Sequence, residues 1–226
     1  MALSERRELA RRVAGLYVIV DPELTMGREV QEVTLAALRG GAKAIQYRDK
    51  LRDKGDQLAI AHALRDLCNQ HSASFIINDH ADLAAASGAQ GLHVGQHDLS
   101  VLESRRVVYP TQFVGTSNAT PEEVQDSLDH GADYIAVGTM FTTDSKAQTR
   151  PVGLKGLKRI RSLVTDISLV AIGGITLDNV GQVLEAGADG ICVISAVCSA
   201  DDPEVAARVL VQRIAAHTDG DTGASA

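Results

Sequence analysis

Short apolar runs alternate along the chain with longer stretches whose apolar residues recur every three or four positions. The short runs predict buried strands, and the longer stretches predict helices that pack one face against those strands. Strands are expected at 16–20, 44–48, 74–78, 91–95, 113–117, 134–139, 168–173 and 190–195. Helices are expected at 28–39, 54–70, 81–86, 99–107, 121–128, 154–163, 177–185 and 203–216. Thr120 and Asp202 or Asp201 precede prolines and are candidate helix caps.

A Gly-Ala pair follows every second predicted helix. The four copies begin at Gly41, Gly88, Gly131 and Gly187, and the intervals between them are 47, 43 and 56 residues. Glycine commonly ends a helix because it adopts the left-handed backbone conformation without strain. Each interval has room for two strand-helix units, so the four copies predict eight strands.

Eight alternating strand-helix units in about 200 residues are typical of a (β/α)8 TIM barrel. We therefore expect a single barrel domain over residues 1–226, with a disordered tail from about residue 217, where Thr, Asp, Gly and Ser predominate. A doubly wound open sheet is the alternative. That fold usually carries a glycine-rich fingerprint after its first strand, and the segment Asp21-Pro22-Glu23 has none.

Composition argues against nucleic acid and membranes as partners. The 29 acidic and 22 basic residues give a net charge of −7, with no basic block and few aromatic residues. No uncharged apolar stretch approaches the length of about 18 residues that a membrane span needs. Cys68, Cys192 and Cys198 are odd in number and form no CxxC pair, which indicates a reducing compartment and a cytoplasmic protein. The expected partners are small molecules, and the oligomeric state stays open.

The second predicted strand carries polar residues on one face. Side chains alternate along a strand, so Ile45 and Tyr47 share one face while Gln46, Arg48 and Lys50 share the other. An unpaired cation is costly in a protein interior. Two interpretations follow: the cations pair with acidic residues on neighbouring strands, or they bind an anionic ligand.

Other strands also end in polar residues, and in a barrel the chemistry lies at the carboxyl ends of the strands. These residues are Asn78 and Asp79, Gln96 and Asp98, Ser117 and Asn118, Thr142 to Lys146, Gly173 and Gly174, and Ile194 and Ser195. A purely structural chain has no reason to gather polar residues at so many ends of one rim, so the rim is the candidate site.

Asp79 and Asp98 are carboxylates on adjacent strand ends. They could bind an Mg²⁺ ion that also binds a polyphosphate, because this ion takes few protein ligands and keeps several water ligands. His80, His93 and His97 make a softer transition-metal site conceivable, although oxygen ligands favour a hard ion. Helix capping is the alternative role for either aspartate alone.

The remaining rim residues suggest two anion sites. Arg48, Lys50 and Lys146 supply positive charge for a diphosphate. Glycines after the seventh strand and a small polar residue after the eighth let backbone amides approach a phosphate. The residues on this second side are Thr143, Ser145, Gly174, Ile194 and Ser195. Lys146 lies in a polar loop over 141–153 that is long enough to act as a lid, or it is a solvated loop lysine.

Taken together, these motifs resemble those of the thiamine-phosphate synthase family. The resemblance covers residues 16–197 and rests on Gln46-x-Arg48-x-Lys50, Asn78-Asp79, His93-x-Gly95-Gln96-x-Asp98, Gly115-x-Ser117, Thr143-x-Ser145-Lys146, Ala171-Ile172-Gly173-Gly174-Ile175 and Ile194-Ser195-Ala196. The departures are few: Tyr47 stands where leucine is more usual, and Thr139 and Thr142 stand where proline is frequent.

The resemblance implies an enzyme that joins 4-amino-2-methyl-5-(diphosphooxymethyl)pyrimidine to 4-methyl-5-(2-phosphooxyethyl)thiazole, or to its carboxylated precursor, and releases diphosphate. By resemblance, the pyrimidine diphosphate contacts would be Gln46, Arg48, Lys50, Asn78, Ser117 and Lys146. The Mg²⁺ ligands would be Asp79 and Asp98, and the thiazole phosphate contacts would be Thr143, Ser145, Gly174, Ile194 and Ser195.

The family's chemistry needs no general base, because the aminopyrimidine expels diphosphate before the thiazole nitrogen attacks. Catalysis would then come from Lys146, Arg48 and Ser117, with Mg²⁺, stabilising charge on the departing diphosphate. A thiazole tautomerase-like isomerase on the same barrel is an alternative, but it would not need the diphosphate residues. A non-catalytic thiazole-phosphate-binding protein is another, and it would not need two metal carboxylates.

Replacing Lys146 tests its expected role toward the leaving group. Lys146→Ala should lower the single-turnover rate by about 10² to 10³, the usual effect of removing one preorganised donor to developing charge. Lys146→Arg should recover only part of the rate, because a planar guanidinium places its charge differently from a compact ammonium. If Lys146→Ala binds the diphosphate poorly but reacts at the normal rate, Lys146 is a binding residue instead.

Overall fold

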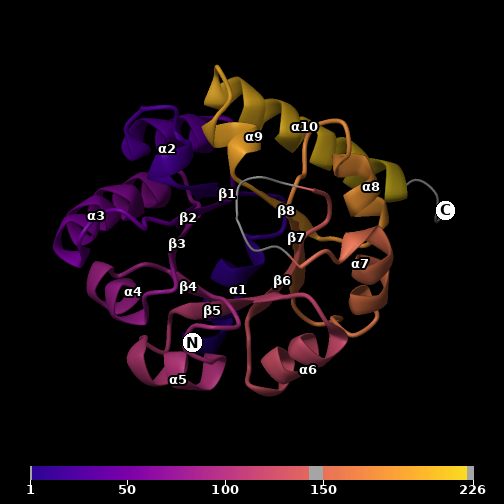
Figure 1. Cartoon of the computed structure of the whole chain (residues 1–226), viewed down its shortest axis with the longest axis horizontal. Coiled ribbons are helices and arrows are strands. Elements are labelled where there is room, and N and C mark those ends of the chain that lie inside the picture. The colour runs from indigo at the N-terminus through magenta and orange to yellow at the C-terminus, as the bar shows by residue number, and fades with distance from the viewer. Residues whose placement is uncertain (1, 143–149, 223–226) are drawn as a thin grey trace.

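The chain forms a closed barrel of eight parallel strands, so the expected TIM barrel is confirmed (Figure 1). The computed structural model describes residues 2–142 and 150–222. The strands are β1 (Leu16–Val20), β2 (Ala44–Tyr47), β3 (Ser74–Asn78), β4 (Gly91–Val94), β5 (Phe113–Asn118), β6 (Tyr134–Gly138), β7 (Ser168–Ile172) and β8 (Gly190–Val193). Each strand pairs with its neighbours in sequence order, and β8 pairs with β1 to close the barrel.

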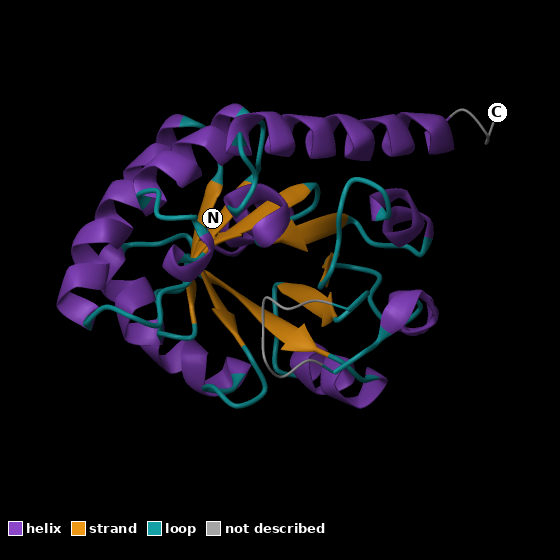
Figure 2. Cartoon of the chain, turned by 45° about the horizontal axis from the view of Figure 1, so that its top comes forward, coloured by secondary structure: helices purple, strands orange, loops and turns teal. Residues whose placement is uncertain are grey.

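Helices surround the strands (Figure 2). They are α1 (Ala2–Arg11), η1 (Pro22–Leu24), α2 (Val30–Arg39), α3 (Lys54–Gln70), α4 (Ala81–Ser87), α5 (Val101–Val107), α6 (Pro121–Asp129), α7 (Gly153–Arg161), α8 (Val180–Glu185), α9 (Ser195–Cys198) and α10 (Pro203–Thr222). No helix in this described part of the chain is long and apolar enough to cross a membrane.

Several helix termini match the sequence-based expectations, and others do not. Thr120 Oγ1 accepts a hydrogen bond from Glu123 N at 3.2 Å, and Asp202 Oδ1 accepts one from Glu204 N at 3.0 Å. The short helices η1 and α9 and the N-terminal α1 were not predicted. The prediction that the last helix ends near residue 216 was wrong, because α10 continues to Thr222. Adding a residue to an existing helix costs little, so residues with weak helix propensity can extend it.

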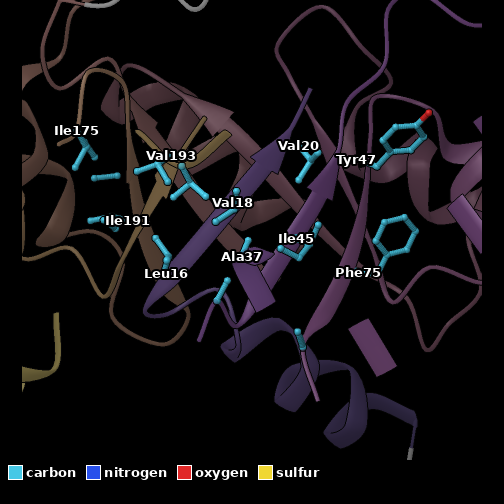
Figure 3. Close-up of a cluster of buried hydrophobic side chains, with 14 of the residues drawn as sticks. Leu16, Val18, Val20, Ala37, Ile45, Tyr47, Phe75, Ile175, Ile191 and Val193 are labelled. Carbon is cyan, nitrogen blue, oxygen red and sulfur yellow. The ribbon is translucent and has the colours of Figure 1, made fainter. Parts of the chain in front are cut away.

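Alternation along the strands divides the core into two layers. The outer layer lies between strands and helices and includes Ile45, Tyr47 and Phe75 (Figure 3). The inner layer fills the barrel and includes Tyr17 and Tyr134, whose side chains are fully buried. The predicted alternation is confirmed here, because Ile45 and Tyr47 share the face that packs beneath the helices.

Helix α1 closes the barrel at the amino ends of its strands. Ser74 Oγ, on the first residue of β3, donates to Leu9 O at 2.8 Å. Arg6 Nε donates to Asp133 Oδ1 at 3.0 Å, and the other oxygen of Asp133 accepts from Val114 N at 2.8 Å. Helix α1 thus covers the amino ends of the strands, and the polar rim residues lie at the opposite, carboxyl ends.

Close packing between β5 and β6 predicts a stability effect at Gly115. A Cβ atom at this position would overlap the ring of Tyr134 on the neighbouring strand. Gly115→Ala should therefore lower the free energy of unfolding by about 1–3 kcal/mol, the usual cost of overpacking. Gly181→Ala on α8 is the matched control, because nothing lies within 4 Å of its added methyl group.

Chemical denaturation of both variants measures the difference. Gly181→Ala should be neutral or more stable by up to about 1 kcal/mol, since alanine has the higher helix propensity. Equal stability of Gly115→Ala and the parent chain would show that Tyr134 can move aside without loss.

Candidate active site

Gln46 places an amide on the inner wall of the barrel. It is 1% exposed, and its Nε2 donates to Tyr17 Oη. Its Oε1 is buried and has no hydrogen-bond partner among the described residues. A buried acceptor without a partner costs free energy, so this oxygen is a candidate contact for a ligand that donates a hydrogen bond.

The cations that follow Gln46 are each paired with a carboxylate. Arg48 Nη1 donates to Asp21 Oδ2, and Lys50 Nζ donates to Asp79 Oδ2 at 2.6 Å. The first interpretation, pairing with acidic residues at neighbouring strand ends, therefore describes this structure. Asp21 directly follows β1 and is 1% exposed. Asp21 was not predicted as a site residue, although its place directly after a strand was an available signal.

A second carboxylate, Asp49, holds the loop that carries both cations. Its Oδ2 accepts from Tyr47 Oη and from Arg52 Nη1, both at 2.7 Å. Its Oδ1 accepts from Leu51 N at 2.8 Å and from Arg52 N at 3.1 Å. Burial alone would raise the pKa of Asp49, but these hydrogen bonds outweigh it and hold the pKa below the ordinary 3.8. Asp49 therefore fixes the backbone between Arg48 and Lys50.

Asp79 and Asp98 lie together at the rim, as predicted. They line one cavity of about 350 Å³ with Lys50, Lys54, His80 and Asp82. Asp98 Oδ2 also accepts from Gly95 N at 2.8 Å. Burial and the Asp79 carboxylate raise the pKa of Asp98. Burial also acts to raise the pKa of Asp79, but hydrogen bonds from Lys50 and Asp98 outweigh it and lower the value.

Asp79 and Asp98 interact directly, and two adjacent carboxylates repel each other when both are ionised. A hard divalent ion between them would relieve their repulsion, and hard oxygen donors are what Mg²⁺ prefers. The donor chemistry of Asp79 and Asp98 thus fits Mg²⁺. No group of three or more His, Cys, Asp and Glu that could hold a metal occurs within residues 2–142 and 150–222. The alternative site of His80, His93 and His97 is accordingly not formed.

Ser117 and His93 belong to a polar chain inside the barrel. His93 Nε2 lies 2.8 Å from Ser117 Oγ, and His93 Nδ1 lies 2.7 Å from Tyr134 Oη. Tyr134 Oη in turn lies 3.1 Å from Tyr17 Oη. Neither tyrosine was predicted as a site residue, because nothing in the local sequence says which residues meet across a closed barrel.

The remaining predicted residues are distributed around the same rim. Asn78 ends β3 and is 8% exposed. Gly174 has φ of 64°, and a Cβ there would meet Thr142 O at 2.6 Å, so only glycine fits this close approach. Ile194 is 7% exposed and precedes α9, and Ser195 is exposed on the first residue of α9. Thr143, Ser145 and Lys146 lie outside the described residues.

Comparisons with known proteins agree over most of the chain. A family described as thiamine monophosphate synthase matches residues 16–197. The thiamine-phosphate synthase of Albidiferax ferrireducens is 45% identical over 200 residues, which cover 88% of this chain and 91% of the relative. That of Methanospirillum hungatei is 46% identical over 196 residues, covering 86% and 94%. A solved structure of thiamine phosphate pyrophosphorylase from Pyrococcus furiosus has a TM-score of 0.85 at 37% identity, covering 92% of this chain and 98% of that one.

Asp49→Asn tests whether this carboxylate stabilises the loop. The variant leaves Arg52 without its ionic partner, so the free energy of unfolding near neutral pH should fall by about 1–3 kcal/mol. The pKa of Asp49 is lowered from 3.8, so its contribution is present above that value and is lost as the pH falls through the folded-state pKa. Denaturation at several pH values should therefore show the two proteins converging in acid.

Asp66→Asn is the matched control, because Asp66 forms an exposed pair with Arg65. This control should change stability by no more than about 0.5 kcal/mol. A constant difference between Asp49→Asn and the parent at every pH would contradict the ionic account.

Proposed function

The chain belongs to the thiamine monophosphate synthase family, and we propose that it makes thiamine phosphate at the rim residues described above. The pyrimidinylmethyl group of 4-amino-2-methyl-5-(diphosphooxymethyl)pyrimidine would pass to the nitrogen of 4-methyl-5-(2-phosphooxyethyl)thiazole, and diphosphate would leave. The observation that best supports this rim as the active site is the cluster of Lys50, Asp79 and Asp98 around one cavity. Such a cluster has groups for both an anion and a cation.

The pyrimidine diphosphate would bind over β2 to β5. The unpartnered Oε1 of Gln46 would accept a hydrogen bond from the 4-amino group. Arg48 and Lys50 would bind diphosphate oxygens, and Asn78 would complete the contact from the end of β3. Arg48 can do so because its guanidinium has five N–H donors, and the contact to Asp21 leaves others available.

Asp79 and Asp98 would hold Mg²⁺. The ion would supply positive charge against the diphosphate as negative charge develops there. Pairing Asp79 with Mg²⁺ would also release Lys50 from its present contact with that carboxylate. We infer Mg²⁺ dependence from this donor set.

The thiazole phosphate would bind over β6 to β8. Gly174 and Ser195 lie at the ends of neighbouring strands β7 and β8, and the close approach at Gly174 requires the absence of a side chain. Ile194 would pack beside the ligand. Thr143 and Ser145 are assigned to the same phosphate from the sequence motif.

The reaction proceeds by dissociation followed by capture. The bond between the methylene carbon and the diphosphate oxygen breaks, and its electron pair leaves with the oxygen. Electron donation from the amino group stabilises the resulting pyrimidine cation, and the thiazole nitrogen lone pair then forms the new carbon–nitrogen bond. No proton needs to move in these steps, so the catalytic task of Ser117, Arg48 and Lys146 is to stabilise the departing diphosphate.

The direct test is an assay of the purified protein with both substrates and Mg²⁺. Formation of thiamine phosphate and diphosphate in equal amounts is expected. Thiamine phosphate should not form when either substrate is omitted. Failure of the complete mixture to yield it would overturn the proposed function.

Asp98→Asn tests the metal assignment. Loss of one ligand charge should weaken Mg²⁺ binding, measured by calorimetry with the pyrimidine diphosphate present, and should lower turnover by about 10²-fold. The fold should persist because an exposed rim residue contributes little packing. Asp82→Asn is the control, because it removes a carboxylate that lines the same cavity but is not one of the proposed Mg²⁺ ligands.

The control variant should keep most of the Mg²⁺ affinity. Full activity of Asp98→Asn, or of the parent protein in excess chelator, would contradict the assignment.

A further inference from the structure

Five side chains from five strands form one hydrogen-bonded chain across the inside of the barrel. They are, in order of contact, Gln46 on β2, Tyr17 on β1, Tyr134 on β6, His93 on β4 and Ser117 on β5. The middle three are buried: Tyr17 and Tyr134 are 0% exposed and His93 is 7% exposed. Both ends are residues assigned above to the pyrimidine diphosphate. This row of hydrogen-bonded side chains therefore joins the two ends of one substrate site.

Donor and acceptor roles in the first half follow from the amide of Gln46. Its Nε2 donates to Tyr17 Oη. Tyr17 has a single hydroxyl proton, and its other hydrogen bond among the described residues is to Tyr134 Oη. A buried hydroxyl proton without an acceptor is costly. Tyr17 must therefore donate to Tyr134.

The second half follows in the same way. Tyr134 accepts from Tyr17, so its own proton is available for His93 Nδ1, which lies 2.7 Å away. An imidazole nitrogen that accepts carries no proton, so in this arrangement Nδ1 of His93 is unprotonated and the ring proton is on Nε2. Nε2 then donates to Ser117 Oγ at 2.8 Å. Among the described residues the hydroxyl proton of Ser117 then has no acceptor, so it is left to donate to a ligand in the barrel mouth.

We propose that Tyr17, Tyr134 and His93 are positioning residues that fix Ser117 as a hydrogen-bond donor to the leaving diphosphate. This inference rests on the proposed function. It also couples the two ends of the site: an amino group that donates to Gln46 Oε1 holds the amide with Nε2 toward Tyr17. Recognition of the aminopyrimidine thus sets the direction of every hydrogen bond as far as Ser117.

The opposite direction defines the competing state. If the Gln46 amide were reversed, Tyr17 would donate to its oxygen, Tyr134 would donate to Tyr17, and His93 would carry its proton on Nδ1. Ser117 would then donate to His93 and present lone pairs to the diphosphate, which repels them. The thiol of Cys192 interacts electrostatically with both tyrosines, but sulfur is a much weaker acceptor than a phenol oxygen.

Nitrogen NMR of the full-length protein labelled with ¹⁵N-histidine reads the tautomer directly. The sequence has seven histidines, and the His93 signals are identified by their loss in His93→Gln. At mildly alkaline pH, an unprotonated Nδ1 and a protonated Nε2 are expected. A proton on Nδ1 would overturn the proposal. This measurement needs no catalytic activity, so its failure is distinguishable from failure of the proposed function.

A double-mutant cycle tests whether Tyr134 acts through Ser117. Tyr134→Phe keeps the ring but removes the hydroxyl, and should lower kcat by about five- to tenfold with little change in KM for the pyrimidine diphosphate. Ser117→Ala should lower kcat further. Adding Tyr134→Phe to Ser117→Ala should cause no additional loss, because the group that Tyr134 positions is then absent.

Tyr47→Phe is the matched control. It removes another buried tyrosine hydroxyl, which donates to Asp49 and is not one of the five hydrogen-bonded side chains inside the barrel. The fold-decrease in kcat caused by Tyr47→Phe should be the same in the parent protein and in Ser117→Ala, so the two decreases multiply in the double variant. Multiplicative effects for Tyr134→Phe and Ser117→Ala would show a merely structural role and overturn the proposal. If Tyr134→Phe does not fold, the NMR measurement of the His93 tautomer in the unmodified protein tests the proposal instead.

Discussion

The interior of a closed parallel barrel receives every second side chain of each strand, and in this chain several of those positions are polar. A buried polar group must be hydrogen-bonded, or it destabilises the fold. Tyr17, Tyr134 and His93 meet this requirement by bonding to one another across the barrel. Because each hydroxyl has one proton to donate, the orientation of the Gln46 amide sets the direction of every hydrogen bond between these groups. A constraint on stability thus also orders the groups that face the substrate.

The cations at the rim are also held by partners within the protein. Arg48 and Lys50 are held by Asp21 and Asp79, and the loop between them is fixed by the buried Asp49. The Lys50–Asp79 pair is partly exposed and contributes little to stability, so exchanging this carboxylate for a diphosphate costs little. Arg48 is paired with the buried Asp21 and can bind diphosphate with the N–H groups that this contact leaves available. Asp49 forms four local hydrogen bonds that face away from the inner wall. The rim therefore combines a fixed backbone with cations that can bind a diphosphate.

Much of this arrangement could be predicted from the sequence. Strand positions follow from apolar runs, and alternation placed Ile45 and Tyr47 outside and Gln46 inside. The rim as the site followed from polar residues at strand ends, which are local features. Partners across the barrel could not be predicted, because Tyr17 and Tyr134 are separated by 117 residues and meet only when the barrel closes. Asp21 was missed although it directly follows a strand, and its pairing with Arg48, which follows the next strand, could not be predicted. The roles of Thr143, Ser145 and Lys146 remain predictions from sequence.

The central claim is that the rim binds the pyrimidine diphosphate with its amino group on Gln46 and its diphosphate on the cations. A crystal structure of the protein with Mg²⁺, this substrate and a thiazole analogue lacking the nucleophilic nitrogen tests it most directly. We expect the 4-amino group within hydrogen-bond distance of Gln46 Oε1, the diphosphate on Arg48, Lys50 and Ser117, and Mg²⁺ on Asp79 and Asp98. A diphosphate bound away from Arg48, Lys50 and Ser117 would contradict this claim.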